Sequence, residues 1–197
     1  VTVYEHPKLV RADADLTFPA YTRLPARRIE DTRRITAVEG ARVDLTLNLN
    51  KAVASAQLVP RSTNQASLSL QFTTNRAVLQ LSQHVLETSG TYDLRLVDAD
   101  GRTNKVASSL VFEAQRNRIP EMKLAAPKGD VRPSALEEIR FEGSVWDDFG
   151  IEAYGLAYTV SDGEVRTVQL GGSVAAQTRV PFQHELRLED LGVRADQ

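Results

Sequence analysis

Apolar and polar residues alternate along most of the chain, and helical periodicity is nearly absent. In the segments VRADADLTF (10–18) and VDLTLNLN (43–50), every second residue is apolar, so one face of each predicted strand points to a core. Turn residues separate the segments. This pattern is typical of a β-sandwich. The first part of the chain is predicted to contain seven short strands, at about 10–18, 43–49, 53–60, 66–72, 77–82, 91–97 and 105–113.

The segment QRNRIP (115–120) is polar, has no periodicity and ends in proline, which predicts a linker. A second alternating series follows, with five predicted strands at about 121–125, 139–146, 153–160, 165–170 and 182–188. The sequence therefore predicts an all-β protein of two tandem sandwiches, residues 1–117 and 118–197. A seven-stranded sandwich would need two more strands than the second series supplies. We expect the second domain to be truncated, with part of its core and edge exposed, unless it is of a smaller type.

Length and composition fit this prediction. A chain of 197 residues suits two domains of roughly 100 residues each. Hydrophobic content of 42% with 25% charged residues is ordinary for a globular protein. Cysteine is absent, so packing and not disulfides must hold each sandwich. The chain begins at Val1 without a methionine, and we expect it to be a fragment of a longer protein.

The net charge of −2 hides an asymmetry between the two predicted domains. Residues 1–118 contain 16 Lys and Arg against 12 Asp and Glu, a net charge of +4. Residues 119–197 contain 8 against 14, a net charge of −6. The two domains are expected to have different surfaces, and neither charge is large enough to indicate nucleic-acid binding.

The segment LQLSQHVLETSGTYDL (79–94) resembles the E–F segment of immunoglobulin-like domains. The resemblance implies that Tyr92 forms a tyrosine corner, with its ring inward and its hydroxyl bonded to the preceding turn. It also implies that Leu47 and Leu94 take the places of the two disulfide cysteines, so that packing replaces the bridge. Thr88 stands where an aspartate is common, and the third strand has no tryptophan. The resemblance therefore implies tandem immunoglobulin-like sandwiches without antibody-type recognition.

Longer stretches resemble large bacterial envelope proteins of unknown function. These carry membrane helices near the N terminus, then immunoglobulin-like repeats, then helical coiled coils. The matching segments are VTVYEHPKL, FPAYTRLP, AVEGARVDLTLNLNKAVASAQLV, GTYDLRLVDADGRTN and VWDDFGIEAYGLAYTV. The resemblance implies a periplasmic or cell-surface position in a membrane-anchored protein, and it implies no activity.

The arginine-rich segment FPAYTRLPARRIEDTRRITAVEG (18–40) is the first candidate binding site. Pro19 and Pro25 disfavour helix and predict an irregular crossing between strands. Its arginines could bind phosphate or an anionic polysaccharide. Glu30 and Asp31 interrupt them, which favours a solvated loop that pairs with itself; packing on the acidic second domain is a further alternative. The arginines are Arg23, Arg27, Arg28, Arg33 and Arg34.

Two acidic segments are weak calcium candidates. In DADGRTN, the oxygen ligands of Asp98, Asp100 and Asn104 are spaced loosely like a calcium loop, but the further acids of an EF-hand are missing. The Asp-Gly pair favours a tight hairpin turn instead. In WDDFG, Asp147 and Asp148 could hold Ca²⁺ as in cadherin-like repeats, with Glu121 and Asp130 as conceivable partners. A plain loop is the favoured interpretation there.

The sequence contains no catalytic motif that we could identify. The three histidines, His6, His84 and His184, are scattered without metal-ligand spacing. Paired acids such as Glu137-Glu138 are adjacent in sequence, and neighbours in a strand point to opposite faces, which argues against a glycosidase pair. We therefore expect a protein that is not an enzyme and that binds no cofactor.

The leading interpretation is a structural or interaction module that spaces parts of an envelope protein or binds other protein domains. One alternative is a carbohydrate- or peptidoglycan-binding module. It would require exposed, coplanar aromatic rings, for which Tyr21, Trp146, Tyr154 and Tyr158 are the candidates. Another alternative is an accessory domain of an exported enzyme.

Overall fold

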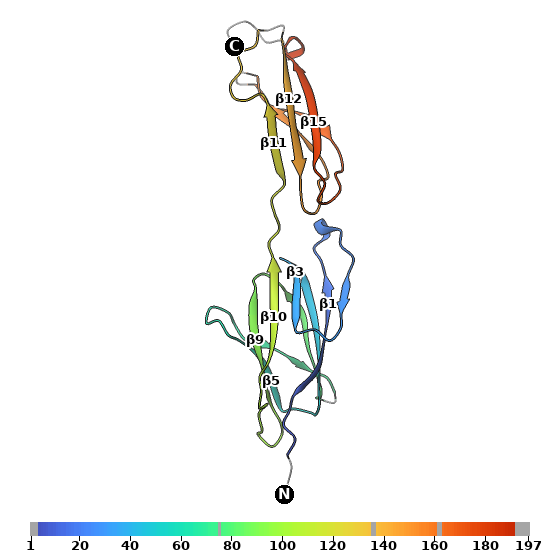
Figure 1. The fold of residues 1–197 in the computed structure, drawn as a ribbon, viewed down its shortest axis with the longest axis vertical. Coiled ribbons are helices and arrows are strands. Elements are labelled where there is room, and N and C mark those ends of the chain that lie inside the picture. Colours follow the sequence, from blue (N-terminus) through green and yellow to red (C-terminus); the bar gives the residue numbers. More distant parts are fainter. Residues whose placement is uncertain (1–3, 75, 135–136, 161–162, 192–197) are drawn as a thin grey trace. The chain divides into compact units, whose positions relative to one another are not determined.

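The computed structural model of the chain describes residues 4–74, 76–134, 137–160 and 163–191 (Figure 1). Regular structure in these residues is β-strand apart from two single-turn 3-10 helices, η1 (Ala20–Thr22) and η2 (Glu189–Leu191). The predicted all-β sandwich fold is thereby confirmed. The chain divides into two compact units, Val1–Asn117 (unit 1) and Arg118–Gln197 (unit 2), and each is described by itself.

Unit 1 is a β-sandwich of two five-stranded sheets, with the strand orders β2-β1-β4-β8-β7 and β3-β10-β9-β5-β6. The described pairs are antiparallel except that β3 runs parallel to β10. The strands are β1 (Leu9–Thr17), β2 (Arg27–Ile29), β3 (Arg34–Val38), β4 (Arg42–Leu49), β5 (Ser55–Pro60), β6 (Leu68–Ser69), β7 (Gln71–Phe72), β8 (Val78–Val85), β9 (Gly90–Val97) and β10 (Ser108–Gln115).

The core of unit 1 lies between its two sheets. Alternate residues of β4 from Val43 to Leu49 are buried, as are those of β9 from Tyr92 to Leu96. Because the side-chain period of a strand is two, the pattern seen in the sequence becomes one apolar face per sheet. The fully buried Phe112 of β10 fills part of the space between the sheets.

Two predictions for unit 1 were wrong in detail. Residues 18–40 are not a single irregular crossing, because they contain η1, β2 and β3. These short strands carry little periodicity and form because partners lie beside them: Ile29 pairs with Ala14, and Ile35 pairs with Phe112. The predicted strand at 66–72 is two strands, since β6 pairs with β5 of one sheet and β7 with β8 of the other.

Unit 2 contains the five strands that the second alternating series predicted. They form a three-stranded sheet, β11-β12-β15, and a two-stranded sheet, β13-β14. A small core of Val145, Ile151 and Val174 lies within it, with Tyr154 and Phe182 packed against that core. The strands are β11 (Glu121–Ala126), β12 (Glu138–Trp146), β13 (Tyr154–Tyr158), β14 (Arg166–Gly171) and β15 (Val180–Arg187).

Candidate functional site

The structure separates the five arginines of residues 18–40 instead of gathering them into one patch. Arg28, on β2, lies 3.7–3.9 Å from carboxylates of Asp13, Asp15 and Glu30. Arg34, at the start of β3, pairs with Glu113 of β10. Of these ion pairs, the one between Arg28 and Glu30 lies within the segment, and the others join it to β1 and β10. The remaining three arginines lie elsewhere: Arg23 ends η1 in the left-handed conformation, Arg27 is exposed on β2, and Arg33 lines a cavity.

Asp13 anchors the arginine-rich segment to β1. Its carboxylate accepts hydrogen bonds from the Arg11 Nε at 2.7 Å and from the backbone N–H of Asp31 at 3.0 Å. Hydrogen bonding to Arg11, followed by that to Asp31, lowers the pKa of Asp13 below its ordinary value. The Asp13 carboxylate therefore links β1 to the residues that follow β2, and protein donors occupy it.

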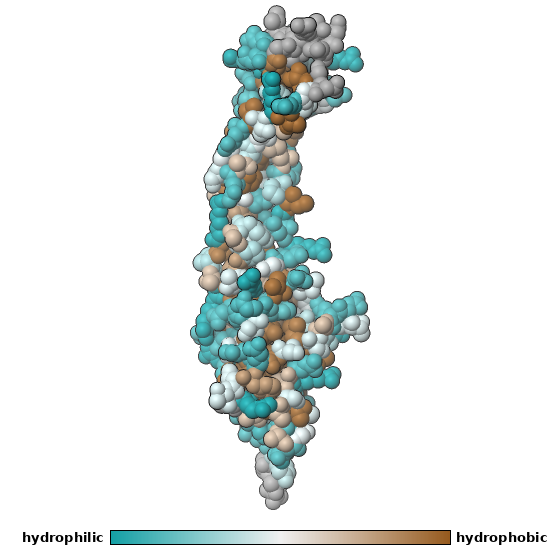
Figure 2. Space-filling view, turned by 180° about the vertical axis from the view of Figure 1, so that it is seen from behind, coloured by the Kyte–Doolittle hydropathy of each residue, from teal (hydrophilic) through white to brown (hydrophobic). Residues whose placement is uncertain are grey.

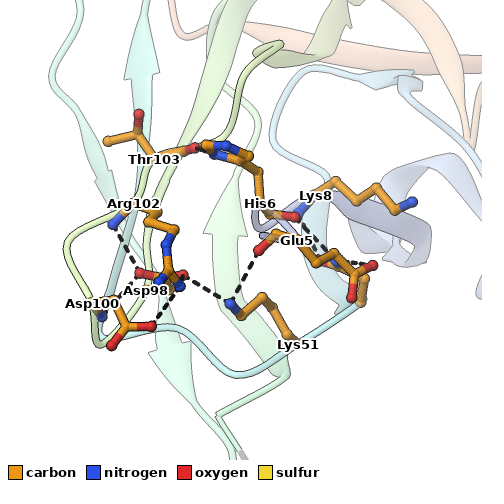
Figure 3. Close-up of polar contacts among 9 residues, drawn as sticks. Glu5, His6, Lys8, Lys51, Asp98, Asp100, Arg102 and Thr103 are labelled. Carbon is orange, nitrogen blue, oxygen red and sulfur yellow. Dashed lines mark hydrogen bonds and ion pairs between the residues drawn. The ribbon is translucent and has the colours of Figure 1, made fainter. Parts of the chain in front are cut away.

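Asp98 fixes the turn between β9 and β10 (Figure 3). The residue is only 2% exposed, and its Oδ2 accepts a hydrogen bond from the Lys51 Nζ at 2.8 Å. Its Oδ1 accepts the backbone N–H groups of Asp100 and Arg102, at 3.0 and 2.8 Å. The hydrogen bond from Lys51 is the largest cause that lowers the pKa of Asp98 to about 2. Gly101 takes a positive φ of 77°, as the predicted Asp-Gly turn requires.

The oxygens proposed for calcium in this turn have protein partners. The Oδ1 of Asn104 accepts the backbone N–H of Leu96 at 2.9 Å, and its Nδ2 donates to the carbonyl of Leu94 at 3.0 Å. Asp100 pairs with Arg102 at 2.5 Å. Lys51, Arg102 and backbone N–H groups thus occupy the side-chain oxygens of the proposed calcium site. Among the described residues, no group of three or more metal-ligating side chains is found.

Asp147 and Asp148 in unit 2 also face local partners. The Oδ2 of Asp147 accepts the backbone N–H of Phe149 at 2.9 Å, and that of Asp148 accepts the N–H of Arg118 at 3.3 Å. The second oxygen of Asp148, Oδ1, is buried without a hydrogen-bond partner. Glu121, one of the proposed companions, pairs with Arg179 at 2.6 Å. The acids of this loop are therefore not assembled into a cation site.

The three residues singled out by the immunoglobulin-like resemblance lie in the core of unit 1. Leu47 on β4 and Leu94 on β9 are fully buried, one in each sheet. The Tyr92 ring meets Phe112 edge-on, with centroids 5.5 Å apart and planes at 85°. Burial raises the pKa of Tyr92 above its ordinary value. Its predicted hydrogen bond to the preceding turn stays a prediction.

The N-terminal segment is tied to the same end of unit 1 as the Asp98 turn (Figure 3). Asn50 donates to the Glu5 carboxylate at 2.9 Å and to the carbonyl of His6 at 3.1 Å. The His6 Nδ1 lies 2.9 Å from the carbonyl oxygen of Thr103, which can only accept, so the ring nitrogen is the donor. These contacts hold Glu5 and His6 in place, and the sequence predicted none of them.

A basic cavity of about 400 Å³ lies beside this segment. Three basic side chains line it: Lys8 of the N-terminal segment, Arg33 directly before β3, and Lys105 of the loop before β10. The three are far apart in sequence and follow no motif, so sequence reasoning found only Arg33. We call this cavity, defined by Lys8, Arg33 and Lys105, the basic pocket.

Unit 2 carries a second feature that the sequence did not locate, an uncovered part of its inner sheet face. Met122 of β11 lies opposite Val145 of β12, so both side chains point to the same face. Val145 is 1% exposed, whereas Met122 is 49% and Leu124 is 53% exposed. The two-stranded sheet packs on the β15 side, where Tyr154 lies 5.9 Å from the Phe182 ring. We call Met122 and Leu124, the half-exposed residues on the inner side of β11, the open face.

The aromatic side chains of unit 2 that were candidates for a carbohydrate platform are half-buried. Tyr154 and Tyr158 alternate with exposed residues on β13 and are half-buried. Trp146 is half-buried, with the Arg118 guanidinium 6.0 Å from its ring. Tyr21, which is exposed, belongs to unit 1. Within unit 2, these three candidate rings therefore do not form an exposed platform. Figure 2 shows apolar side chains scattered among hydrophilic ones on the face it draws.

No protein-family model matches the chain, and no curated protein matches it. Among the described residues, no helix is long and apolar enough to cross a membrane.

Proposed function

We propose that this chain is a non-enzymatic structural and interaction module of a bacterial envelope protein, acting as a spacer and as a protein-binding domain. A periplasmic or cell-surface position belongs to the same proposal and is supported by the sequence resemblance to envelope proteins. Protein binding is supported by one observation, the open face of unit 2. Apolar side chains that lie on the inner side of a sheet and remain half-exposed favour contact with another protein segment.

The chemistry of the open face indicates the kind of partner. Within the described residues, β13 pairs with β14 and has no strand on its other edge. A strand that added to this edge would satisfy its backbone groups and place alternate side chains towards Met122 and Leu124. The proposed partner is therefore an extended segment with alternating apolar residues. Such a segment binds through main-chain hydrogen bonds and gains affinity from apolar burial.

Site-specific cross-linking from β11 tests this function. A photoreactive amino acid replaces Met122 in one protein and Lys123 in a matched control, because neighbouring strand residues point to opposite faces. Lys123 lies on the outer side, where it pairs with Glu121 at 3.0 Å. We expect defined proteins from a native envelope extract to be linked at position 122 and not at 123. Equal labelling at both positions, or none at 122, would reject the open face as a protein-binding surface.

A further inference from the structure

The basic side chains of the basic pocket in unit 1 differ from neighbouring basic residues in their ion pairing. Neighbouring cations have carboxylate partners: Arg34 pairs with Glu113, and Lys51 pairs with Asp98. Within the described part of the chain, the side chains of Lys8, Arg33 and Lys105 form no ion pair, although they line one cavity. Like charges that share a cavity repel one another, so an anion that enters it relieves this repulsion.

Among the described residues that line the cavity, Glu5 is the one carboxylate, and it is already engaged. Glu5 accepts a hydrogen bond from Asn50 at 2.9 Å, which directs it towards the β4 end of the sandwich. Three cations therefore face one partly satisfied acid. An arginine offers a planar pair of donors to a carboxylate or phosphate, and two lysines add charge without a fixed direction.

The walls of the pocket are held in place before any ligand binds. The backbone N–H of Lys8 donates to Asn50 at 2.7 Å, and Lys51 donates to the carbonyl of Glu5 at 3.2 Å. The backbone carbonyl of Arg33 accepts the N–H of Val111 at 2.8 Å. A site whose backbone is fixed in this way loses little conformational entropy on binding.

The lining also has an apolar part, beside the polar His6 and Ser108. Val106 is 80% exposed, and Tyr4 and Pro7 lie in the same lining. The Tyr4 ring is fixed by the Arg102 guanidinium, which lies 4.4 Å from its centroid. An apolar wall beside cations suits a ligand that has both a flat apolar face and an anionic group. A pyranose ring that carries a carboxylate or phosphate has this combination, and a cavity of about 400 Å³ is large enough for such a residue.

We propose that the basic pocket binds an acidic saccharide, with Arg33 contacting its anionic group and Lys8 and Lys105 neutralising its charge. Of the five arginines in residues 18–40, Arg33 is the one that contributes to this site. The proposal is independent of the open face, because it concerns unit 1 alone and needs no protein partner.

Calorimetric titration of the 197-residue chain with trigalacturonic acid at low ionic strength tests the proposal. We expect saturable binding that weakens with added salt, and no binding of the matching neutral galactose trisaccharide. The double substitution R33Q/K105Q should weaken binding about tenfold or more. R27Q is the matched control, since Arg27 is an exposed arginine of unit 1 outside the pocket, and it should bind as the unsubstituted chain does.

Several results would overturn the proposal. They are the absence of binding by the acidic trisaccharide, equal affinity for the neutral one, and equal loss in R27Q and in R33Q/K105Q. Inorganic phosphate is titrated as well, because a cluster of cations can attract any small anion. If phosphate alone bound as tightly as the acidic trisaccharide, the saccharide part would contribute nothing and the ligand class would be wrong. Circular dichroism of each variant checks that the sandwich remains folded.

Discussion

In unit 1 the inner faces of both sheets are buried, whereas in unit 2 most inner-facing side chains keep part of their surface in solvent. Of 27 buried apolar residues in the described part of the chain, 23 belong to unit 1. Both units have strands of alternating residues, so the difference does not come from the local pattern. On β4 the inner-facing residues are buried, while every second residue of β15 is only half-buried.

The difference follows from how many strands face one another. In unit 1 each sheet has five strands, and each therefore covers the other. In unit 2 two strands face three, and the smaller sheet packs on the β15 side. β11 is then left with Met122 and Leu124 half-exposed. Alternation thus makes a face apolar, but the face becomes buried only where strands of the facing sheet cover it.

The largest expected effect is a difference in stability between the two units. Because burial of apolar area is the main favourable term in folding, we expect unit 2 to unfold at a lower urea concentration than unit 1. Trp146 is the single tryptophan of the chain and belongs to unit 2, so its fluorescence follows that unit. Far-UV circular dichroism follows both. A single coincident transition by the two probes would contradict the comparison.

Replacing one leucine by alanine in each unit measures how much burial contributes to the stability of that unit. Leu94→Ala removes a fully buried side chain and should lower the free energy of unfolding of unit 1 by about 2–5 kcal/mol. Leu156→Ala removes a half-buried side chain and should cost unit 2 only about 1–2 kcal/mol. Urea titrations followed by hydrogen exchange assign each loss to its unit. Equal losses would mean that the inner face of unit 2 is as well covered as that of unit 1.

A glycine in unit 2 tests whether any part of its inner face is closely packed. A Cβ at Gly143 would clash with the carbonyl oxygen of Lys123 and lie 2.6 Å from the Phe182 ring. Gly143→Ala should therefore destabilise unit 2 by about 1–3 kcal/mol, as overpacking does. Gly172→Ala is the control, since a Cβ there meets no atom within 4 Å. The tryptophan fluorescence transition should move to lower urea in the first variant only.

The smallest expected effect is a pH-dependent one at the Asp98 turn. The folded pKa of Asp98, about 2, is below its ordinary value of 3.8, so its ionised form stabilises unit 1 above about pH 4. This contribution is lost as the pH falls through about 2. Asp98→Asn should lower the urea midpoint of unit 1 at pH 7, and the difference from the unsubstituted chain should shrink between pH 4 and pH 2. A difference independent of pH would contradict the role of the Lys51 pair.

The success of the sequence prediction depended on how local each signal was. The long strands β4, β9 and β12 were predicted because each one has enough alternating residues to define a face. β2 and β3 were missed because three or five residues define no period, and the partners that form them lie far away in sequence. Ile35, for example, depends on Phe112.

The candidate sites show the same limit. The turn at Asp98 was predicted from its Asp-Gly pair. The hydrogen bond between Asp98 and Lys51 could not be predicted, because the two residues are 47 positions apart in the sequence. Arginine content alone suggested one binding segment, whereas the structure pairs Arg28 and Arg34 with acids and places Arg33 in a cavity with two distant lysines. Net composition cannot tell a paired cation from an unpaired one.

The sequence by itself determined that the chain is all-β and which faces of its longer strands are apolar. Those properties follow from a two-residue period, which is a local consequence of backbone geometry. Only the tertiary structure decided which apolar faces become buried and which cations share a cavity. Both depend on the number and position of strands that face one another, and that arrangement is set by contacts between residues far apart in the chain.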